Sequence, residues 1–223
     1  MKINLSDTQL FRGISAEDIN SMLSCLETTE KSFKKGETIL QEGSTTEHIG
    51  LVLSGMVLIE HCDIWGTAAV LGSVAPGGVF AEAYACIPGE PLLIRAFAAE
   101  DTAVLFINIS KILNVCSSAC AFHSKLIGNL LTLCAAKSLE LSRRIVHTGS
   151  KTIRGRLLSY FSECVKRSGS NYFDIPYNRQ QLAGYLGVDR SAMSNELSKL
   201  RKEGIIEYDK NSFKVCKTDG LIC

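Results

Sequence analysis

The segment Asn178–Glu203 constrains the fold of this chain more than any other stretch. Asn178 is a candidate N-cap, and three apolar residues follow it at helical spacing: Leu182, Ala183 and Leu186. Asp189 or Arg190 starts a second helix, whose apolar series is Met193, Leu197 and Leu200. Two helices that cross at a steep angle need a small residue at the crossing and a glycine in the turn, which Ala183 and Gly187 supply. The segment therefore predicts a helix-turn-helix.

The opposite face of the second helix is short, polar and rich in hydrogen-bond donors: Arg190, Ser191, Ser194, Asn195, Ser198 and Arg201. In a DNA major groove, Arg pairs with guanine and Asn with adenine, each worth about 1–3 kcal/mol of discrimination. A merely solvated helix face is the alternative. The turn pair and the flanking basic residues occur together with this face, so we expect binding to double-stranded DNA.

The residues after the second helix predict a two-stranded wing. Gly204 ends the helix, Ile205–Tyr208 alternates as a short strand, and Phe213–Val215 returns after a turn at Asp209–Ser212. Basic wing residues are suited to phosphate contacts, which give affinity without sequence information. The segment is thus predicted to be a winged helix-turn-helix.

The charge of the chain is divided unequally between its two ends. Residues 1–149 contain 11 Lys and Arg against 15 Asp and Glu, a net charge of −4, and residues 150–223 contain 13 against 8, a net charge of +5. The basic end carries the predicted helix-turn-helix, as attraction to phosphate requires, so DNA binding is expected to depend on salt.

The composition favours a cytoplasmic protein. No apolar run reaches the ~18 residues of a membrane span, and no secretory signal is evident. The nine cysteines have no scaffold spacing and are expected to be reduced thiols.

Residues 5–30 are predicted to be an amphipathic helical region, in which Ser15 is expected to cap a helix. Residues 32–109 consist of short apolar runs separated by Gly, Pro or charged turns. The runs are Thr38–Leu40, Ile49–Leu53, Met56–Glu60, Ala68–Val74, Leu92–Ala98 and Ala103–Ile109. Many short strands with regular turns indicate a sandwich or barrel, whose interior is a candidate ligand cavity.

A long helix is predicted from about Ser117 to His147, with a heptad-like seam at Ile127, Leu131, Cys134, Ser138, Leu141 and Ile145. Such a helix favours a homodimer, since helix-turn-helix proteins usually read two half-sites. The alternative is a helix buried against its own domain. Thr148–Ser150 is predicted to be a hinge, followed by an amphipathic helix over 151–168.

This order of elements resembles the Crp–Fnr family of bacterial transcription regulators over nearly the whole chain. The motifs are Phe33–Glu37, Leu53–Val57 and Pro76–Glu82 in the roll and, more specifically, Arg179–Ala183 and Asp189–Leu197. The resemblance implies an α+β fold with three parts: an effector-sensing, cyclic-nucleotide-binding-like antiparallel β-roll (1–116), a dimerisation helix (117–148) and a winged helix-turn-helix (149–223). RNA polymerase is left open as a further partner.

In the same resemblance, Arg190 and Ser191 fall on base-reading positions, and Asn195 falls on one that is often Arg. Arg179 and Gln180 fall near phosphate. The residues expected to contact DNA are Asn178, Arg179, Gln180, Arg190, Ser191, Ser194, Asn195, Lys199, Lys210 and Lys214.

The effector site departs from the cyclic-nucleotide-binding members. Glu82 stands at the ribose-binding glutamate, but Ala81 replaces the preceding glycine, and Leu92 and Leu93 replace the phosphate-binding arginine and hydroxyl. Arg95, in a predicted strand, would point to the opposite face. Cyclic AMP is therefore not expected to bind well. The candidate pocket for another small molecule is Phe80, Glu82, Ala83, Tyr84, Leu92 and Leu93; packed core is the alternative.

No residue pattern indicates a catalytic or metal site, and the cofactor is unknown. Cys25 alone in the N-terminal segment cannot supply an iron–sulfur cluster, and Cys116, Cys120 and Cys134 are expected to be buried helix residues. His61–Asp63 is a candidate haem or metal patch, and the roll offers only His48 and His61 where a metal-dependent cupin needs two or three histidines with a carboxylate. We therefore expect a DNA-binding regulator and not an enzyme; the alternative is a ligand-binding or interaction module with a structural helix-turn-helix.

Overall fold

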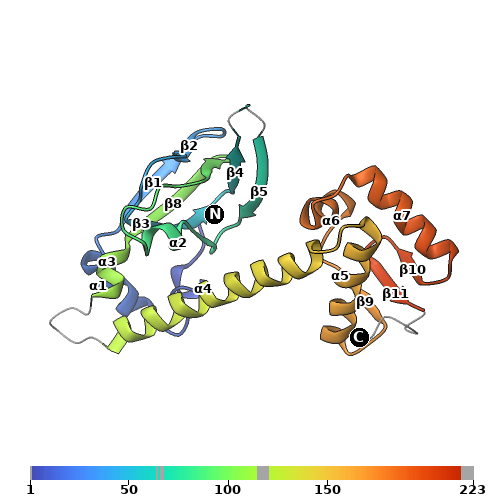
Figure 1. The fold of residues 1–223 in the computed structure, drawn as a ribbon. Helices are drawn as coiled ribbons and strands as arrows, with labels where there is room; N and C mark the ends of the chain where they lie inside the picture. The colour runs from blue at the N-terminus through green and yellow to red at the C-terminus, as the bar shows by residue number, and fades with distance from the viewer. Residues whose placement is uncertain (1, 64, 66–67, 115–120, 217–223) are drawn as a thin grey trace. The chain divides into compact units, whose positions relative to one another are not determined.

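The chain forms two compact units, residues 1–136 and 137–223 (Figure 1). A computed structural model describes residues 2–63, 65, 68–114 and 121–216. The division falls inside one long helix, upstream of the loop at Thr148–Ser150 where the sequence predicts a hinge.

The first unit contains two antiparallel four-stranded sheets, with strand orders β1-β8-β3-β6 and β2-β7-β4-β5. The strands are β1 Thr29–Phe33, β2 Thr38–Leu40, β3 His48–Ser54, β4 Val57–Cys62, β5 Ala68–Val74, β6 Val79–Phe80, β7 Arg95–Ala98 and β8 Thr102–Asn108. A small core of buried side chains includes Val52, Val57, Phe80, Ala96, Val104 and Phe106 from both sheets. The expected β-roll is confirmed.

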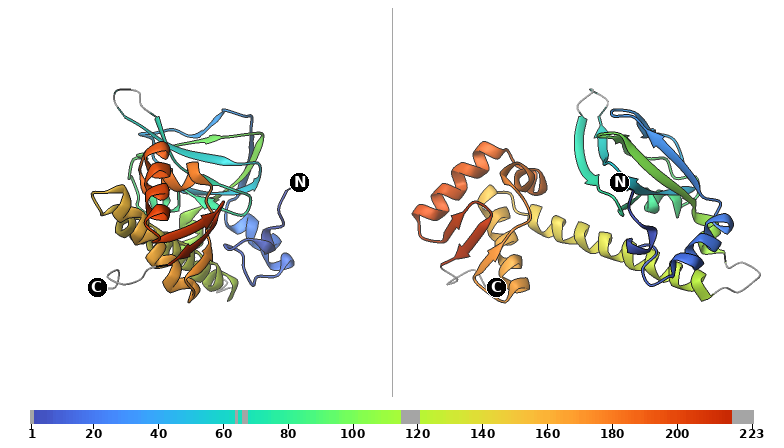
Figure 2. Two further views of the ribbon diagram at one scale, coloured as in Figure 1. Left: turned by 90° about the vertical axis from the view of Figure 1, so that its right-hand side faces the viewer. Right: turned by 180° about the vertical axis from the view of Figure 1, so that it is seen from behind.

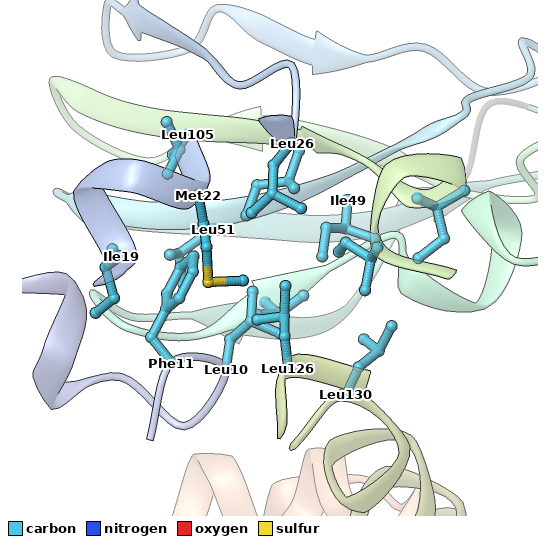
Figure 3. Close-up of a cluster of buried hydrophobic side chains, with 14 of the residues drawn as sticks. Leu10, Phe11, Ile19, Met22, Leu26, Ile49, Leu51, Leu105, Leu126 and Leu130 are labelled. Atoms are coloured by element: carbon cyan, nitrogen blue, oxygen red, sulfur yellow. The ribbon is translucent and has the colours of Figure 1, made fainter. Parts of the chain in front are cut away.

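Short helices and the start of the long helix cover one sheet. They are η1 Leu5–Asp7, α1 Ala16–Cys25, α2 Glu82–Ala85, α3 Ile109–Leu113 and α4 Ala121–Thr148. Ser15 caps α1 as expected, since its hydroxyl accepts a hydrogen bond from the Asp18 N–H at 3.2 Å. Figure 3 shows Leu10, Phe11 and Met22 gathered with Leu126 of α4 against the strands. This second, larger core fixes the N-terminal segment and the first half of α4 on the sheet.

Helix α4 has a buried side and an exposed apolar side. Leu126, Leu130 and Leu133 are buried in the core of the first unit. Large apolar side chains elsewhere on the helix remain exposed: Leu131, Leu139, Leu141, Ile145 and Val146. The alternative of a helix buried against its own domain therefore holds for one stripe, whereas much of the predicted seam stays exposed. The predicted start at Ser117 lies outside the described residues.

The second unit is a helical domain with a small sheet (Figure 2). Its elements are α5 Ile153–Ser168, β9 Tyr172–Asp174, α6 Arg179–Leu186, α7 Arg190–Lys202, β10 Ile206–Asp209 and β11 Ser212–Val215, and the strand order is β10-β11-β9. Phe161 packs between Phe173 and Phe213, at ring-centroid distances of 6.0 and 4.8 Å. The apolar residues that predict the helix-turn-helix are all buried in this core. The predicted winged helix-turn-helix is therefore confirmed.

The strand prediction over Leu92–Ala98 is correct only from Arg95 onward. The Leu92 N–H donates to the Ser44 carbonyl, and the Leu92 carbonyl accepts from the Gly43 N–H, both at 2.8 Å. These bonds hold Leu92 against a turn instead of in a strand ladder. In the described part of the chain, no helix is long and apolar enough to cross a membrane.

Candidate DNA-binding surface and effector site

Local capping sets both ends of the helix-turn-helix. Asn178 and Gln181 form a capping box at the start of α6, with each side chain accepting from the other residue's N–H at 2.9 Å. Gly187 ends α6 with φ +62°, a left-handed conformation that glycine adopts without steric cost. The Asp189 carboxylate then accepts from the Ala192 N–H at 2.8 Å and starts α7. The start of α6, the turn at Gly187 and the start of α7 are thus all set by local sequence.

Helix α7 presents a polar face with free hydrogen-bonding groups. Arg190, Ser191 and Asn195 are exposed, and among the described residues their side chains have no hydrogen-bond partner. The hydroxyl of half-buried Ser194 donates to the Arg190 carbonyl at 2.9 Å, so it is left with acceptor capacity. The face can therefore offer a guanidinium, an amide and hydroxyls to base edges.

Arg179 is placed differently from a free phosphate-binding arginine. Its guanidinium lies over the rings of Tyr208 and Phe213, at 4.8 and 5.0 Å from their centroids. One of its amino groups donates to the Lys210 carbonyl at 3.1 Å, and burial lowers the pKa of the guanidinium. Arg179 therefore connects α6 to the turn of the wing.

The other residues predicted to contact DNA all lie on the surface of the second unit. Gln180 is exposed, and Lys210 is exposed in the wing turn with φ +50°. The exposed Lys199 pairs with the largely buried Glu196 at 3.4 Å, and Lys214 forms an exposed ion pair with Glu207 at 3.3 Å. The side chains of both lysines are more than half exposed, so both ammonium groups remain available to an anion. Asn178 contributes its side-chain oxygen to the capping box.

Two arginines that the sequence reasoning missed support the helix-turn-helix from behind. Arg154 at the start of α5 forms ion pairs with Glu196 and Glu203 of α7. Arg156 donates to carbonyl groups at the end of α6. Neither residue stands in an apolar pattern or a motif, so only the fold brings them to these partners.

In the first unit, the residues of the candidate effector pocket are divided between core and surface. Phe80 is buried so close to Gly50 that a Cβ on that glycine would lie 2.3 Å from its ring. Glu82 is 7% exposed at the start of α2, Tyr84 is half-buried and Ala83 is exposed.

Ala81, before Glu82, has φ +63°, a conformation that favours glycine. A non-glycine residue held in this conformation is strained.

Leu92 and Leu93 do not form one wall of a pocket. Leu92 is buried, whereas Leu93 is 63% exposed. Arg95 is held by Glu60 of the neighbouring strand, with 3.0 Å between Nε and the carboxylate, and lies over the Phe97 ring. The sequence prediction assumed that Leu92 and Arg95 lie in one strand and therefore point to opposite faces. This reason was wrong, because the strand begins at Arg95. The cross-strand pair with Glu60 occupies the guanidinium instead.

The cysteine and histidine candidates show no cluster in the part of the chain that the structure describes. Cys116 and Cys120 lie outside it, and Cys134 is half-buried beside the core of the first unit. Nδ1 of His61 is 2.9 Å from the Leu93 carbonyl and 3.3 Å from the Glu42 carboxylate. Within the described ranges, no three His, Cys, Asp or Glu residues are grouped to hold a metal ion.

Comparisons with known proteins match both units. The family model for the cyclic nucleotide-binding domain matches residues 30–119, and the model for the Crp-like helix-turn-helix domain matches residues 155–223.

The chain is similar along its length to two curated regulators. It is 24% identical to the cyclic AMP receptor protein of Thermus thermophilus over 212 residues, which cover 95% of this chain and 94% of that protein. It is 22% identical to the transcriptional activator protein FnrL of Cereibacter sphaeroides over 215 residues, covering 89% of this chain and 81% of that protein.

Among solved structures, the fold matches OCPA-complexed CprK with a TM-score of 0.66 at 17% identity, covering 90% of this chain and 91% of that chain.

Proposed function

The chain belongs to the Crp–Fnr family of transcription regulators, and we propose that it binds DNA as a homodimer under the control of a small effector other than cyclic AMP. The observation that carries the proposal is the exposed polar face of α7 on a complete winged helix-turn-helix. In such a dimer, two α7 helices enter successive major grooves about 34 Å apart on a near-palindromic site.

The exposed apolar residues of α4 support the homodimer. Leu131, Leu141 and Ile145 belong to the seam expected from the sequence, and each is exposed. A row of large apolar side chains on one helix face is favourable in water only when another surface covers it. A second copy of the same helix, packed along the same seam, supplies that surface.

The first unit supports an effector role without a cyclic AMP site. The family model assigns residues 30–119 to a cyclic nucleotide-binding domain. However, the positions of the phosphate-binding arginine and hydroxyl hold Leu92 and Leu93, and Arg95 is paired with Glu60. A buried phosphodiester without a cation is strongly disfavoured. The proposed effector is therefore a different small molecule bound near Glu82 and Tyr84.

Catalysis is not part of the proposal, since the related proteins are regulators. RNA polymerase is the further partner that activation of transcription would require. Family membership favours DNA binding over an interaction module in which the helix-turn-helix is only structural.

The DNA-binding face is tested with Arg190→Ala. A binding site is first selected from random duplexes with the wild-type protein, and affinity is then measured by fluorescence anisotropy. Loss of a bidentate guanine contact should weaken binding by about 1–3 kcal/mol and relax the sequence preference at one position of each half-site. Arg12→Ala, an exposed arginine of the first unit, is the matched control and should have no effect. Unchanged affinity for Arg190→Ala would contradict the proposed readout.

A further inference from the structure

Two arginines bind four successive backbone carbonyls at the C-terminal end of α6: Gly184, Tyr185, Leu186 and Gly187. Arg144 donates to the first two, both at 3.1 Å. Arg156 donates to the last two, at 2.9 and 3.0 Å. Carbonyls at a helix C-terminus lack partners within the helix and carry partial negative charge, so guanidinium groups suit them. Both arginines therefore stabilise the end of the first helix of the helix-turn-helix.

The two arginines come from different sides of a loop. Arg156 lies in α5, which belongs with α6 to the DNA-binding domain. Arg144 lies in α4, before the loop that separates α4 from α5 (Figure 1). Arg144 therefore joins the long helix directly to the helix-turn-helix. Arg156 joins α5 to α6, and its Nε also donates to the Ser150 carbonyl of the loop at 2.8 Å.

His147 adds a second connection from α4. It is 2% exposed, its Nδ1 lies 3.0 Å from the Tyr185 hydroxyl of α6, and its Nε2 lies 2.6 Å from the Glu163 carboxylate of α5. Arg143 Nε also lies 3.2 Å from that carboxylate. Burial raises the pKa of the Tyr185 phenol, so its hydroxyl proton is retained for hydrogen bonding. The last two turns of α4 are thus bonded to both following helices, although the loop between them has the composition of a hinge.

The last two turns of α4 also carry seam residues, on the helix face opposite Arg143 and His147. Successive residues of an α-helix are rotated by about 100°, which places Leu141 and Ile145 on the face opposite Arg143 and His147. Leu141 and Ile145 are exposed. One face of this segment is therefore available to the second copy of α4, while the other face is bonded to the DNA-binding domain.

We propose that Arg144 is a positioning residue that sets the half-site spacing the dimer reads. The inference rests on the proposed homodimer. If two α4 helices pack along their seam, the separation and rotation of the two α7 helices depend on how firmly each helix-turn-helix is held to its α4. Two hydrogen bonds from one planar guanidinium fix both position and angle, because the fork has a rigid geometry. Without them, α4 keeps its contacts through His147 and Arg143 but loses two bonds to the end of α6, so each domain gains freedom about the loop at residues 149–152.

The test measures preference for half-site spacing. From a palindrome selected with the wild-type protein, duplexes are made with one base pair added or removed between the half-sites, which shifts one half-site by about 3.4 Å and roughly a tenth of a turn. Affinities are measured for each palindrome and for a single half-site. The wild-type protein should prefer the native spacing by about tenfold or more, since a rigid dimer cannot contact both shifted half-sites.

Arg144→Gln removes the fork and keeps a side chain of similar length. We expect its spacing preference to fall to within about threefold while its affinity for the single half-site stays at the wild-type value. Arg154→Gln is the control: it loses the ion pairs of α5 with Glu196 and Glu203 but, among the described residues, no side-chain bond to α4 or to the loop, so it should weaken all duplexes equally and keep the spacing preference. Arg144→Lys, which keeps the charge and one donor, should lie between wild type and Arg144→Gln, and it replaces Arg144→Gln if that variant does not fold.

The possible results distinguish a failure of the proposed role of Arg144 from a failure of the proposed homodimer. A wild-type spacing preference retained in Arg144→Gln, or retained in Arg144→Lys where that variant is used instead, overturns the role of Arg144 and leaves the homodimer intact. A wild-type protein that binds a single half-site as tightly as the palindrome overturns the two-half-site mechanism and this inference with it. An equal loss of spacing preference in Arg154→Gln shows general loosening of the helix-turn-helix and also overturns the specific role of Arg144.

Discussion

Arg179 illustrates how the role of a single residue depends on its surroundings. The resemblance places it near phosphate, but the structure shows its guanidinium over two rings and bonded to the Lys210 carbonyl. Tyr208 also lies beside Arg201, at 5.3 Å from its guanidinium. The wing is therefore held to α6 by cation–π contacts that the sequence pattern does not reveal, since they join residues about 30 positions apart.

Arg179→Ala should lower the free energy of unfolding by about 1–3 kcal/mol, the sum of two partly buried cation–π contacts and one hydrogen bond. Urea denaturation followed by circular dichroism measures this loss. Arg179→Lys should recover part of the stability, because it keeps a cation near the rings. A phosphate contact would give a different result: unchanged stability, weaker DNA binding and a slope of log K against log salt that is smaller by about 0.9.

At the level of whole elements, α4 has a buried apolar face and an exposed apolar face. Its first half is buried through Leu126, Leu130 and Leu133, and its exposed seam continues through Leu141 and Ile145. A charge at an exposed seam position costs little in a monomer but must be desolvated in a dimer.

Ile145→Glu should therefore convert the dimer to monomers at micromolar concentration, as measured by analytical ultracentrifugation. Leu139→Glu is the control, since Leu139 is also apolar and exposed, at 57% against 70% for Ile145, but does not belong to the predicted seam. Ile145→Glu that remains dimeric would place the dimer contact elsewhere.

Elements with a strong local pattern were predictable. The helix-turn-helix follows from its caps and apolar spacing, and Ala68–Val74 was expected as a strand with the observed limits. β1, Thr29–Phe33, was missed because it is largely polar and exposed, so no apolar alternation marks it.

Within the candidate sites, the exposed face of α7 was foreseen, whereas the contacts of Arg144, Arg154 and Arg156 were not. These arginines bind partners far along the chain, and surface arginines carry no periodic signal.

At the level of the whole molecule, the fold of the first unit does not by itself specify its ligand. Residues 30–119 match the cyclic nucleotide-binding domain, but Leu92 and Leu93 supply no cation or hydroxyl.

We therefore expect cyclic AMP to leave the thermal unfolding of this protein unchanged. A ligand at a hundred times its Kd adds about 2.7 kcal/mol of stability, which a thermal scan resolves easily. The cyclic AMP receptor protein of Thermus thermophilus, as its name states, provides the positive control. A concentration-dependent rise in Tm with cyclic AMP would show that another cation, such as Arg95 released from Glu60, completes the site.

The most direct test of the central claim is the mass of the complex with DNA. The wild-type protein is mixed with a selected palindromic duplex, and the complex is weighed by native mass spectrometry. We expect two protein chains on one duplex and no stable complex with a single chain, because the proposed dimer packs along the seam of α4. A complex with one chain per duplex, at the same affinity, would contradict the homodimer.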